Sequence, residues 1–213
     1  MLHLKSFCFN EFQQNTYLIY DDDGLAFIID PGNSNEKENT ILKSFISDKK
    51  LKLQRLLLTH AHIDHVLGNS FIFDNYGLLP EVHADEMFFL ERMPETAELY
   101  GFSCSPSPMP NKFIKEGDII CLGQYEFKCI FTPGHSPGSI SFYNPSNLIL
   151  ISGDVLFQGS IGRSDLPGGD HEVLIHSIKQ KLMLLPDHVK VYSGHGSMTT
   201  IGFERSHNPF LKE

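Results

Sequence analysis

The feature that most constrains this chain is a short run of metal-capable side chains, THAHIDH, directly behind an apolar run. The apolar run, Leu56–Leu58, is typical of a buried strand, so the cluster is expected at that strand's carboxyl end. Residues two apart in an extended chain point to the same side, which lets His60 and His62 converge on one metal ion. Asp64 and His65 are adjacent and must splay or turn, so they are expected to bind a second ion.

The chemistry of these donors narrows the choice of metal. Imidazole and carboxylate ligands without a thiolate suit zinc, iron or manganese. A lone histidine would more often belong to a polar turn, but four such side chains behind one strand favour a metal site. The cysteines offer no alternative site, because none of the four forms a CxxC pair. Cys121 and Cys129 could face each other across a hairpin, yet both are expected to be thiols of the core.

Three more metal-capable residues occupy the same kind of place, just past an apolar strand. His135 stands in TPGHSPG after a strand that ends near Phe131, Asp154 stands in SGD, and His195 stands in SGHG. Strand ends in a layered fold gather at one edge, so they can deliver their side chains to one pocket. The flanking glycines allow the backbone and a substrate to approach closely. The predicted metal ligands are therefore His60, His62, Asp64, His65, His135, Asp154 and His195.

The remaining elements alternate between strands and helices in each half of the chain. Strands are predicted at 4–9, 16–20, 25–30, 54–58, 118–122, 125–131, 140–143, 148–152 and 189–193. Helices are predicted after a cap near Asn33 or Ser34, along 66–77, within 84–100, and over 171–184 with Asp170 as the cap. The segment 84–110 is expected to rim a pocket. Two sheets packed face to face with helices outside would bury these apolar runs, although other α/β layouts fit the same order.

Length and charge limit the classes of function. A chain of 213 residues is most simply one domain, 1–213, with a sizeable core. The net charge of -9 argues against a nucleic-acid partner, because surfaces that bind phosphate backbones are usually basic. The first residues lack the apolar stretch of a secretory signal, and no apolar run approaches the roughly 18 residues of a membrane span. A cytoplasmic protein with no membrane partner is therefore expected.

These motifs together resemble the metallo-β-lactamase superfamily, and within it the short, single-domain glyoxalase-II-like hydrolases. The resemblance runs from IIDPG at 28–32 to NPFL at 208–211 and includes THAHIDH, PGHSPGS, SGD and SGHGSMTTIGFER. It implies a four-layer αββα sandwich with a dinuclear metal site at one edge of the two sheets. It assigns His60, His62 and His135 to one ion and Asp64, His65 and His195 to the other, with Asp154 bridging them.

Departures from the family patterns refine the expected substrate. Asp154 stands where many true β-lactamases of this fold carry another residue, so antibiotic hydrolysis is not expected. Only eighteen residues follow His195, and Ser197 replaces a tyrosine of the two-domain glyoxalase II enzymes. A site open on the thiol side is therefore expected. Arg163, in the loop 159–169, could bind a substrate carboxylate or pair with a neighbouring aspartate. Asp30 could orient a metal-binding histidine or cap its own turn.

The resemblance implies a metal-dependent hydrolase of thioesters such as S-lactoylglutathione-like acyl-thiols, acting by attack of a metal-bridging hydroxide. Asp64 would also act in catalysis by orienting that hydroxide. Two divalent ions are expected, zinc first, with iron or manganese as alternatives. The competing interpretations are a persulfide dioxygenase with one iron held by His60, His135 and Asp154, and a binding protein with a vestigial site. The complete set of seven ligands argues against a vestigial site.

Overall fold

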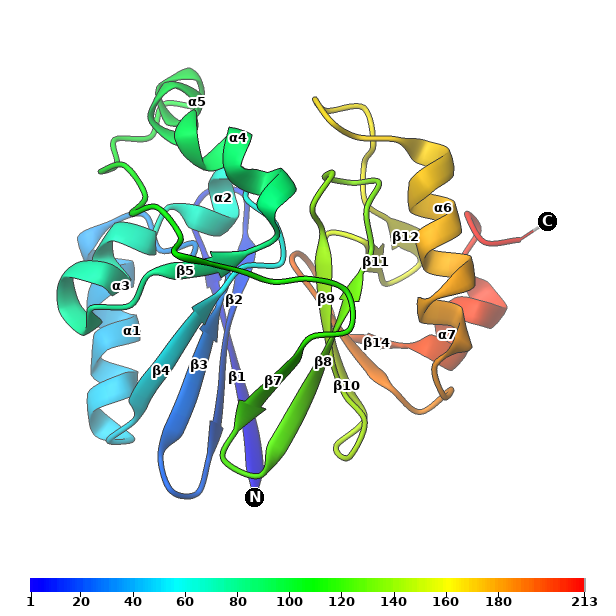
Figure 1. The fold of residues 1–213 in the computed structure, drawn as a ribbon, viewed down its shortest axis with the longest axis horizontal. Helices are drawn as coiled ribbons and strands as arrows, with labels where there is room; N and C mark the ends of the chain where they lie inside the picture. Colours follow the sequence, from blue (N-terminus) through cyan, green and yellow to red (C-terminus); the bar gives the residue numbers. More distant parts are fainter. Residues whose placement is uncertain (213) are drawn as a thin grey trace.

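The computed structural model describes residues 1–212 and contains two six-stranded sheets that pack face to face, with helices on both outer sides (Figure 1). The first sheet has the order β1-β2-β3-β4-β5-β6. Its strands are β1 Leu2–Phe9, β2 Gln14–Asp21, β3 Leu25–Ile29, β4 Lys52–Leu57, β5 Pro80–Val82 and β6 Lys112–Phe113. Strands β1 to β3 pair antiparallel, whereas β3 to β6 pair parallel.

The second sheet has the order β14-β13-β10-β9-β8-β7. Its strands are β7 Ile119–Leu122, β8 Tyr125–Phe131, β9 Ile140–Asn144, β10 Ile149–Gly153, β13 Lys190–Ser193 and β14 Thr199–Thr200. Its β10–β13 pair is parallel and the others are antiparallel. A separate small hairpin joins β11 Leu156–Phe157 to β12 Ser160–Ile161.

Helices cover the two outer faces. The first sheet carries α1 Glu36–Asp48, α2 Ile63–Val66, α3 Asn69–Tyr76, the 3-10 turn η1 Ala84–Glu86, α4 Met87–Glu91 and α5 Met93–Leu99. The second sheet carries α6 His171–Gln180, the 3-10 turn η2 Leu182–Leu184 and α7 Ile201–His207. None of the helices among residues 1–212 is both long and apolar enough to cross a membrane.

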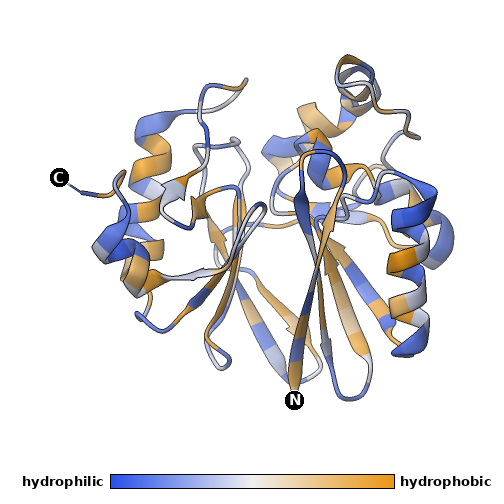
Figure 2. Ribbon diagram, turned by 180° about the vertical axis from the view of Figure 1, so that it is seen from behind, coloured by the Kyte–Doolittle hydropathy of each residue, from blue (hydrophilic) through white to orange (hydrophobic). Residues whose placement is uncertain are grey.

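Three apolar layers lie between the two sheets and the two layers of helices. They form because successive side chains of each strand point to opposite faces of its sheet. On β2, Leu18 packs toward the helices of the first sheet, while Tyr17 and Ile19 pack between the sheets. On β10, Leu150 packs toward α6, while Ile151 faces the first sheet. Figure 2 accordingly shows hydrophobic and hydrophilic bands along the strands. The αββα sandwich predicted from the sequence is confirmed.

Some local predictions were wrong, and the backbone shows why. Residues 84–100 form three short pieces instead of one helix, because Arg92 leaves helical geometry and Pro94 starts α5. Proline lacks an amide hydrogen and its ring would clash with a preceding helical turn, so it is tolerated only near a helix start. Helix α1 is capped by Asn35, one residue beyond the predicted caps. The tail after His195 forms β14 and α7, which the sequence analysis did not predict.

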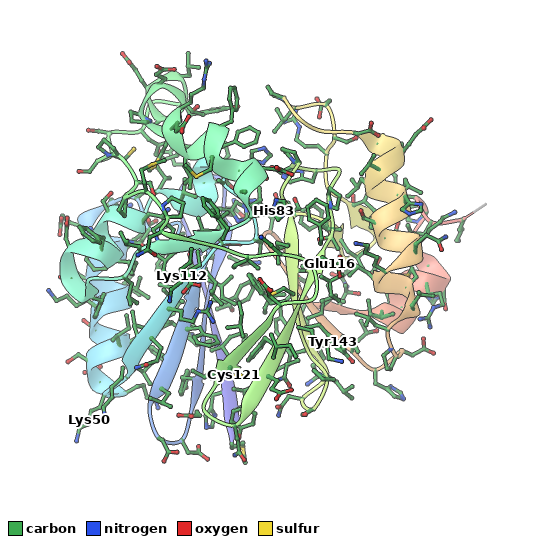
Figure 3. The ribbon with its side chains drawn as sticks, viewed as in Figure 1. Lys50, His83, Lys112, Glu116, Cys121 and Tyr143 are labelled. Carbon is green, nitrogen blue, oxygen red and sulfur yellow. The ribbon has the colours of Figure 1, made fainter. Side chains whose placement is uncertain are left out.

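The cysteine prediction was half wrong. Cys129 is buried in the layer between the sheets, as expected of a core thiol. Cys121 lies on the edge strand β7, is exposed, and pairs in register with Glu126 rather than with Cys129 (Figure 3). An edge strand with one face toward solvent exposes every second side chain, and Cys121 occupies such a position.

Candidate metal centre

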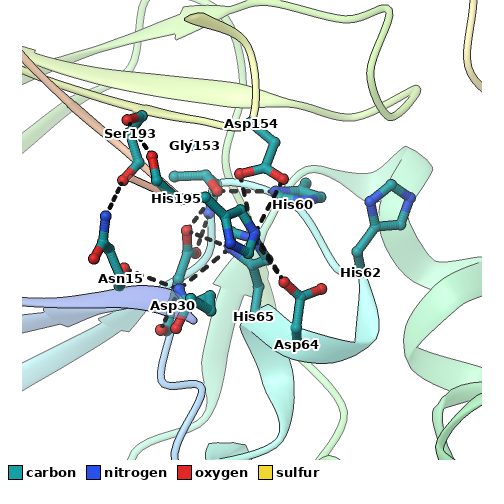
Figure 4. A network of polar contacts seen from close by, with 12 residues as sticks. Asn15, Asp30, His60, His62, Asp64, His65, Gly153, Asp154, Ser193 and His195 are labelled. Atoms are coloured by element: carbon teal, nitrogen blue, oxygen red, sulfur yellow. Dashed lines mark hydrogen bonds and ion pairs between the residues drawn. The ribbon is translucent and has the colours of Figure 1, made fainter. Parts of the chain in front are cut away.

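The predicted metal ligands lie together at one edge of the sandwich, where strands of both sheets end, and Figure 4 labels all of them except His135. His60 follows β4 of the first sheet, whereas Asp154 and His195 follow the neighbouring parallel strands β10 and β13 of the second. The two sheets are tied together at this edge by backbone hydrogen bonding between Asn15 and Gly194, with an N–O distance of 2.6 Å. Residues far apart in the sequence are thereby brought to one place.

The seven side chains form two triads and one residue between them. His60, His62 and His135 have donor atoms within 4.8 Å of one another, and so do Asp64, His65 and His195. These are the groupings that the resemblance implied. Asp154 lies between the triads, with one carboxylate oxygen 3.7 Å from His135 Nε2 and 3.4 Å from His195 Nε2. Its other oxygen is 3.4 Å from His65 Nε2.

Gly194 permits this close approach. A Cβ atom at Gly194 would overlap the Oδ1 atom of Asp154 and lie 2.6 Å from the ring of His65. Any side chain at this position would push the strand end away from the ligands. The glycine that precedes His195 is therefore required by the packing of the two triads.

Unpartnered polar atoms at the centre fit a bound metal. Within the described chain, His60 Nε2, His62 Nε2, His65 Nε2 and Asp154 Oδ1 are buried and have no hydrogen-bond partner. A buried polar atom without a partner costs about 1–3 kcal/mol, and three of these atoms, on His60, His65 and Asp154, lie at the centre. Imidazole nitrogens and a carboxylate oxygen that point at one another are suitable ligands for divalent ions.

Hydrogen bonds from the outer ring nitrogens orient the histidines. His135 Nδ1 donates to the carbonyl oxygen of Arg163 at 2.7 Å, and His195 Nδ1 donates to that of Phe12 at 3.0 Å. Each bond directs the Nε2 atom of its ring inward. Such outer contacts fix the tautomer and ring orientation of a metal-binding histidine. His62 differs, because its Nδ1 atom lies 2.9 Å from His135 Nε2.

Asp30 orients two of the ligands and is not itself free to bind metal. Its carboxylate accepts from the amide of Thr59 at 2.7 Å, from the Thr59 hydroxyl at 2.6 Å and from His65 Nδ1 at 3.0 Å. The Thr59 hydroxyl in turn lies 3.0 Å from His60 Nδ1. Although Asp30 lies close enough to His60 and His65 to form a third group of donors, its oxygens are already occupied. Of the two roles left open by the sequence, the structure shows the orienting one.

The electrostatic environment differs between the triads. Burial lowers the pKa of His60 well below its usual value, and burial together with the neighbouring His135 lowers the pKa of His62 to about 3. Burial also lowers the pKa of His135. These rings are therefore neutral at physiological pH, which is the state in which imidazole binds a metal ion.

In the second triad, the carboxylates raise the histidine pKa values more than burial lowers them. Burial disfavours a charged His65, but Asp64 and Asp154 raise its pKa well above the usual value. Burial likewise opposes protonation of His195, yet its contacts with Asp154 and Asp64 raise its pKa to about 9. Negative charge thus dominates this triad, and an ion that binds there releases protons.

Comparison with known proteins places the chain in a family. The family model for the metallo-beta-lactamase superfamily matches residues 9–195, a span that contains all seven predicted ligands. The chain belongs to the metallo-β-lactamase superfamily. It is therefore a hydrolase of a superfamily whose members bind divalent metals.

Several relatives match over nearly their whole length. Hydroxyacylglutathione hydrolase GloC of Haemophilus influenzae is 42% identical over 202 residues, covering 94% of this chain and 93% of that protein. The crystal structure of the BLEG-1 B3 metallo-beta-lactamase has a TM-score of 0.90 and 37% identity, covering 99% of this chain and 100% of that one. TTHA1623 in a di-iron-bound form has a TM-score of 0.87 and 36% identity, covering 97% and 100%.

Glu86 is a residue of this metallo-β-lactamase site that the sequence analysis missed. It is fully buried and accepts hydrogen bonds from the amides of Ala61 and Gly138, each at 2.7 Å, and from the hydroxyl of Ser136. Ala61 lies between two ligands of the first triad, and Ser136 follows the third. One carboxylate therefore joins the two loops that carry this triad. No local motif marks Glu86, since its partners lie about 25 and 50 residues away.

Replacement of Glu86 by glutamine is expected to weaken metal binding at the first triad. An amide NH2 would face a backbone N–H group, so the two loops would separate and the affinity should fall about 10–100-fold. Competition with a chromogenic chelator measures this affinity. The matched control is Glu204→Gln, because Glu204 is also buried and also accepts three hydrogen bonds, but its donors, Gly159, Thr199 and Asn208, lie outside the two loops of the first triad. Equal metal affinity in the two variants would contradict the role of Glu86.

A cavity of about 490 Å³ opens directly onto the ligands. Helices α4 and α5 form one side of it, and the loop that contains Arg163, Leu166 and Pro167 forms the other (Figure 1). The segment 84–100 thus lines the pocket as predicted, whereas residues 103–110 are not part of this lining. The Arg163 guanidinium binds both oxygens of Asp165 at 2.7 Å. Its contact with a substrate carboxylate stays a prediction.

Proposed function

We propose that this protein is a metal-dependent thioesterase that hydrolyses acyl-glutathione-like substrates. The observation that carries the proposal is the pair of ligand triads on either side of Asp154 at the floor of an open cavity. Two adjacent ions suit hydrolysis, because one reacting group can be held between them. The similarity to GloC over almost the full chain supports an acyl-glutathione substrate. Zinc is the proposed metal.

Two divalent ions bound at the triads would act as Lewis acids and lower the pKa of a water molecule toward about 7. The chain's own contribution centres on Asp64, whose carboxylate lines the cavity and lies 3.0 Å from His195 Nε2. It accepts a hydrogen bond from the attacking water and so fixes the direction of attack. Water adds its oxygen to the acyl carbon, the carbon–sulfur bond breaks, and the thiolate leaves. The products are a carboxylic acid and a thiol.

No general acid is needed on the leaving-group side. A thiolate is a stable leaving group at neutral pH, since thiols have pKa values of about 8.5. The cavity wall accordingly offers no buried acid other than the predicted ligands among the residues described. The site is thus suited to thioesters more than to esters of poorly acidic alcohols.

An activity assay separates this proposal from two competitors. Protein stripped with a chelator and reloaded with zinc should release thiol from an acyl-glutathione thioester, whereas stripped protein should not. A chromogenic cephalosporin is included because BLEG-1 is a B3 metallo-beta-lactamase. Oxygen uptake with glutathione persulfide is measured on iron-loaded protein, since TTHA1623 has been found in a di-iron form. Cephalosporin opening or oxygen uptake without any thiol release would overturn the thioesterase proposal.

A further inference from the structure

The cavity above the metal ligands has an apolar side that the proposed reaction does not use. We call this side the apolar wall and define it by Phe12, Phe88, Phe89, Leu99 and Tyr100. Several of these side chains are exposed, including Leu99 at 85% and Phe88 at 51%. Exposed apolar side chains that gather at the mouth of one cavity commonly mark a ligand-binding surface.

The apolar wall begins at the metal ligands themselves. Phe89 packs edge-on against His62 with ring centroids 5.2 Å apart. Phe12 accepts the hydrogen bond of His195 through its carbonyl oxygen, and its ring packs edge-on against Tyr100 at 5.5 Å. A substrate whose acyl carbon lies at the ligands would therefore place its next atoms against these rings.

Few charged side chains line the cavity outside the metal ligands, and the two cations already contact other side chains. Outside the metal ligands, the charged residues of the lining are Arg92, Glu95 and Arg163. Arg163 is paired with Asp165, and the Arg92 guanidinium lies 4.6 Å above the ring of Phe88. Glu95 would repel a carboxylate. The glutathionyl group carries two carboxylates, so it fits the side of the cavity that contains Arg163 better than the apolar wall.

We propose that the apolar wall binds the acyl group of the substrate, and that this acyl group is hydrophobic. The preferred substrates are then thioesters of medium-length aliphatic or aromatic acids, with the three-carbon hydroxyacyl group of a lactoyl thioester as a poor one. The cavity volume of about 490 Å³ lies within the range of sites that enclose whole small molecules. The inference rests on the proposed thioesterase function and specifies its substrate class.

A binding experiment with compounds that cannot be hydrolysed tests whether the apolar wall binds a hydrophobic group. The probes are the hexyl and methyl thioethers of one small neutral thiol, titrated into zinc-loaded protein. Each methylene group buried should strengthen binding about fourfold, so the hexyl compound is expected to bind at least tenfold more tightly. Phe88→Ser and Leu99→Ser should reduce that ratio. Phe73→Ser is the matched control, because Phe73 is 42% exposed on α3 and does not line the cavity.

Kinetics then test the substrate class. On the same neutral thiol, kcat/KM for the hexanoyl thioester should exceed that for the lactoyl thioester at least tenfold, and Phe88→Ser should lower the ratio. Equal kcat/KM values for the hexanoyl and lactoyl thioesters would overturn the inference while leaving a thioesterase in place. A preference for the hexyl thioether that is unchanged in both wall variants would do the same. Thioether binding as expected without hydrolysis of any thioester would overturn the proposed function instead. A dimer lost on Leu99→Ser, with unchanged preference, would assign the wall to a second copy of the chain.

Discussion

Replacing Asp154 by asparagine should weaken metal binding at both triads together and slow hydrolysis strongly. The Asp154 carboxylate has one oxygen toward His65 and the other toward His135 and His195, so this one carboxylate faces both triads. Metal content should fall from about two ions per chain to less than one after gel filtration. Losing several kcal/mol of charge stabilisation should lower kcat/KM by about a thousandfold.

The variant should nevertheless fold. Asparagine matches the shape of aspartate, and Asp154 itself is not part of the apolar layers of the sandwich. Circular dichroism and thermal melting of the metal-free forms check this point. The control is Asp85→Ala, because Asp85 is exposed on η1 outside the cavity and should retain both ions. Two tightly held ions in Asp154→Asn would show that this carboxylate does not serve both triads.

A second large effect is expected at Asp30, where stability and metal binding are coupled. Asp30→Ala would leave three buried donors without an acceptor, two on Thr59 and one on His65. The free energy of unfolding should fall by about 3–5 kcal/mol, as is typical when one partner of a buried charged network is removed. Metal affinity should fall about 10–100-fold as well, because His60 and His65 lose their orientation. Urea denaturation with and without zinc measures both effects.

Asp22→Ala is the matched control for this prediction. Asp22 also contacts a histidine, with its Oδ1 atom 2.7 Å from His3 Nε2, but at an exposed position. Exposed ion pairs contribute little to stability, so the midpoint of urea denaturation and the zinc affinity should stay at the wild-type values. Equal losses in the two variants would indicate a general effect of removing an aspartate.

The layered fold, and the meeting of the seven predicted ligands at one edge, could be predicted because their signals are local. THAHIDH is one continuous run, and each of His135, Asp154 and His195 follows a strand that its own apolar residues reveal. Because strand ends in a layered fold lie at one edge, these positions are expected to meet there. The predictions were wrong where a detail of the backbone decided the outcome. Pro94 divided a predicted helix, and the exposed face of edge strand β7 left Cys121 outside the core.

The surroundings of the ligands could not be predicted in the same way. Glu86 acts through bonds to loops distant in sequence, and only the folded chain shows that its three donors meet. The apolar wall combines Phe12 from one end of the first sheet with α4 and α5. Arg163 had two open roles in the sequence, and the structure shows its pairing with Asp165 while leaving substrate contact to experiment.

The most direct test of the dinuclear centre is anomalous X-ray diffraction at the zinc absorption edge, on crystals of protein reloaded with zinc. We expect two separate anomalous peaks. One should lie among His60, His62 and His135, the other among Asp64, His65 and His195, and both should adjoin the Asp154 carboxylate. A single peak confined to one triad, or peaks that do not adjoin Asp154, would contradict the dinuclear centre.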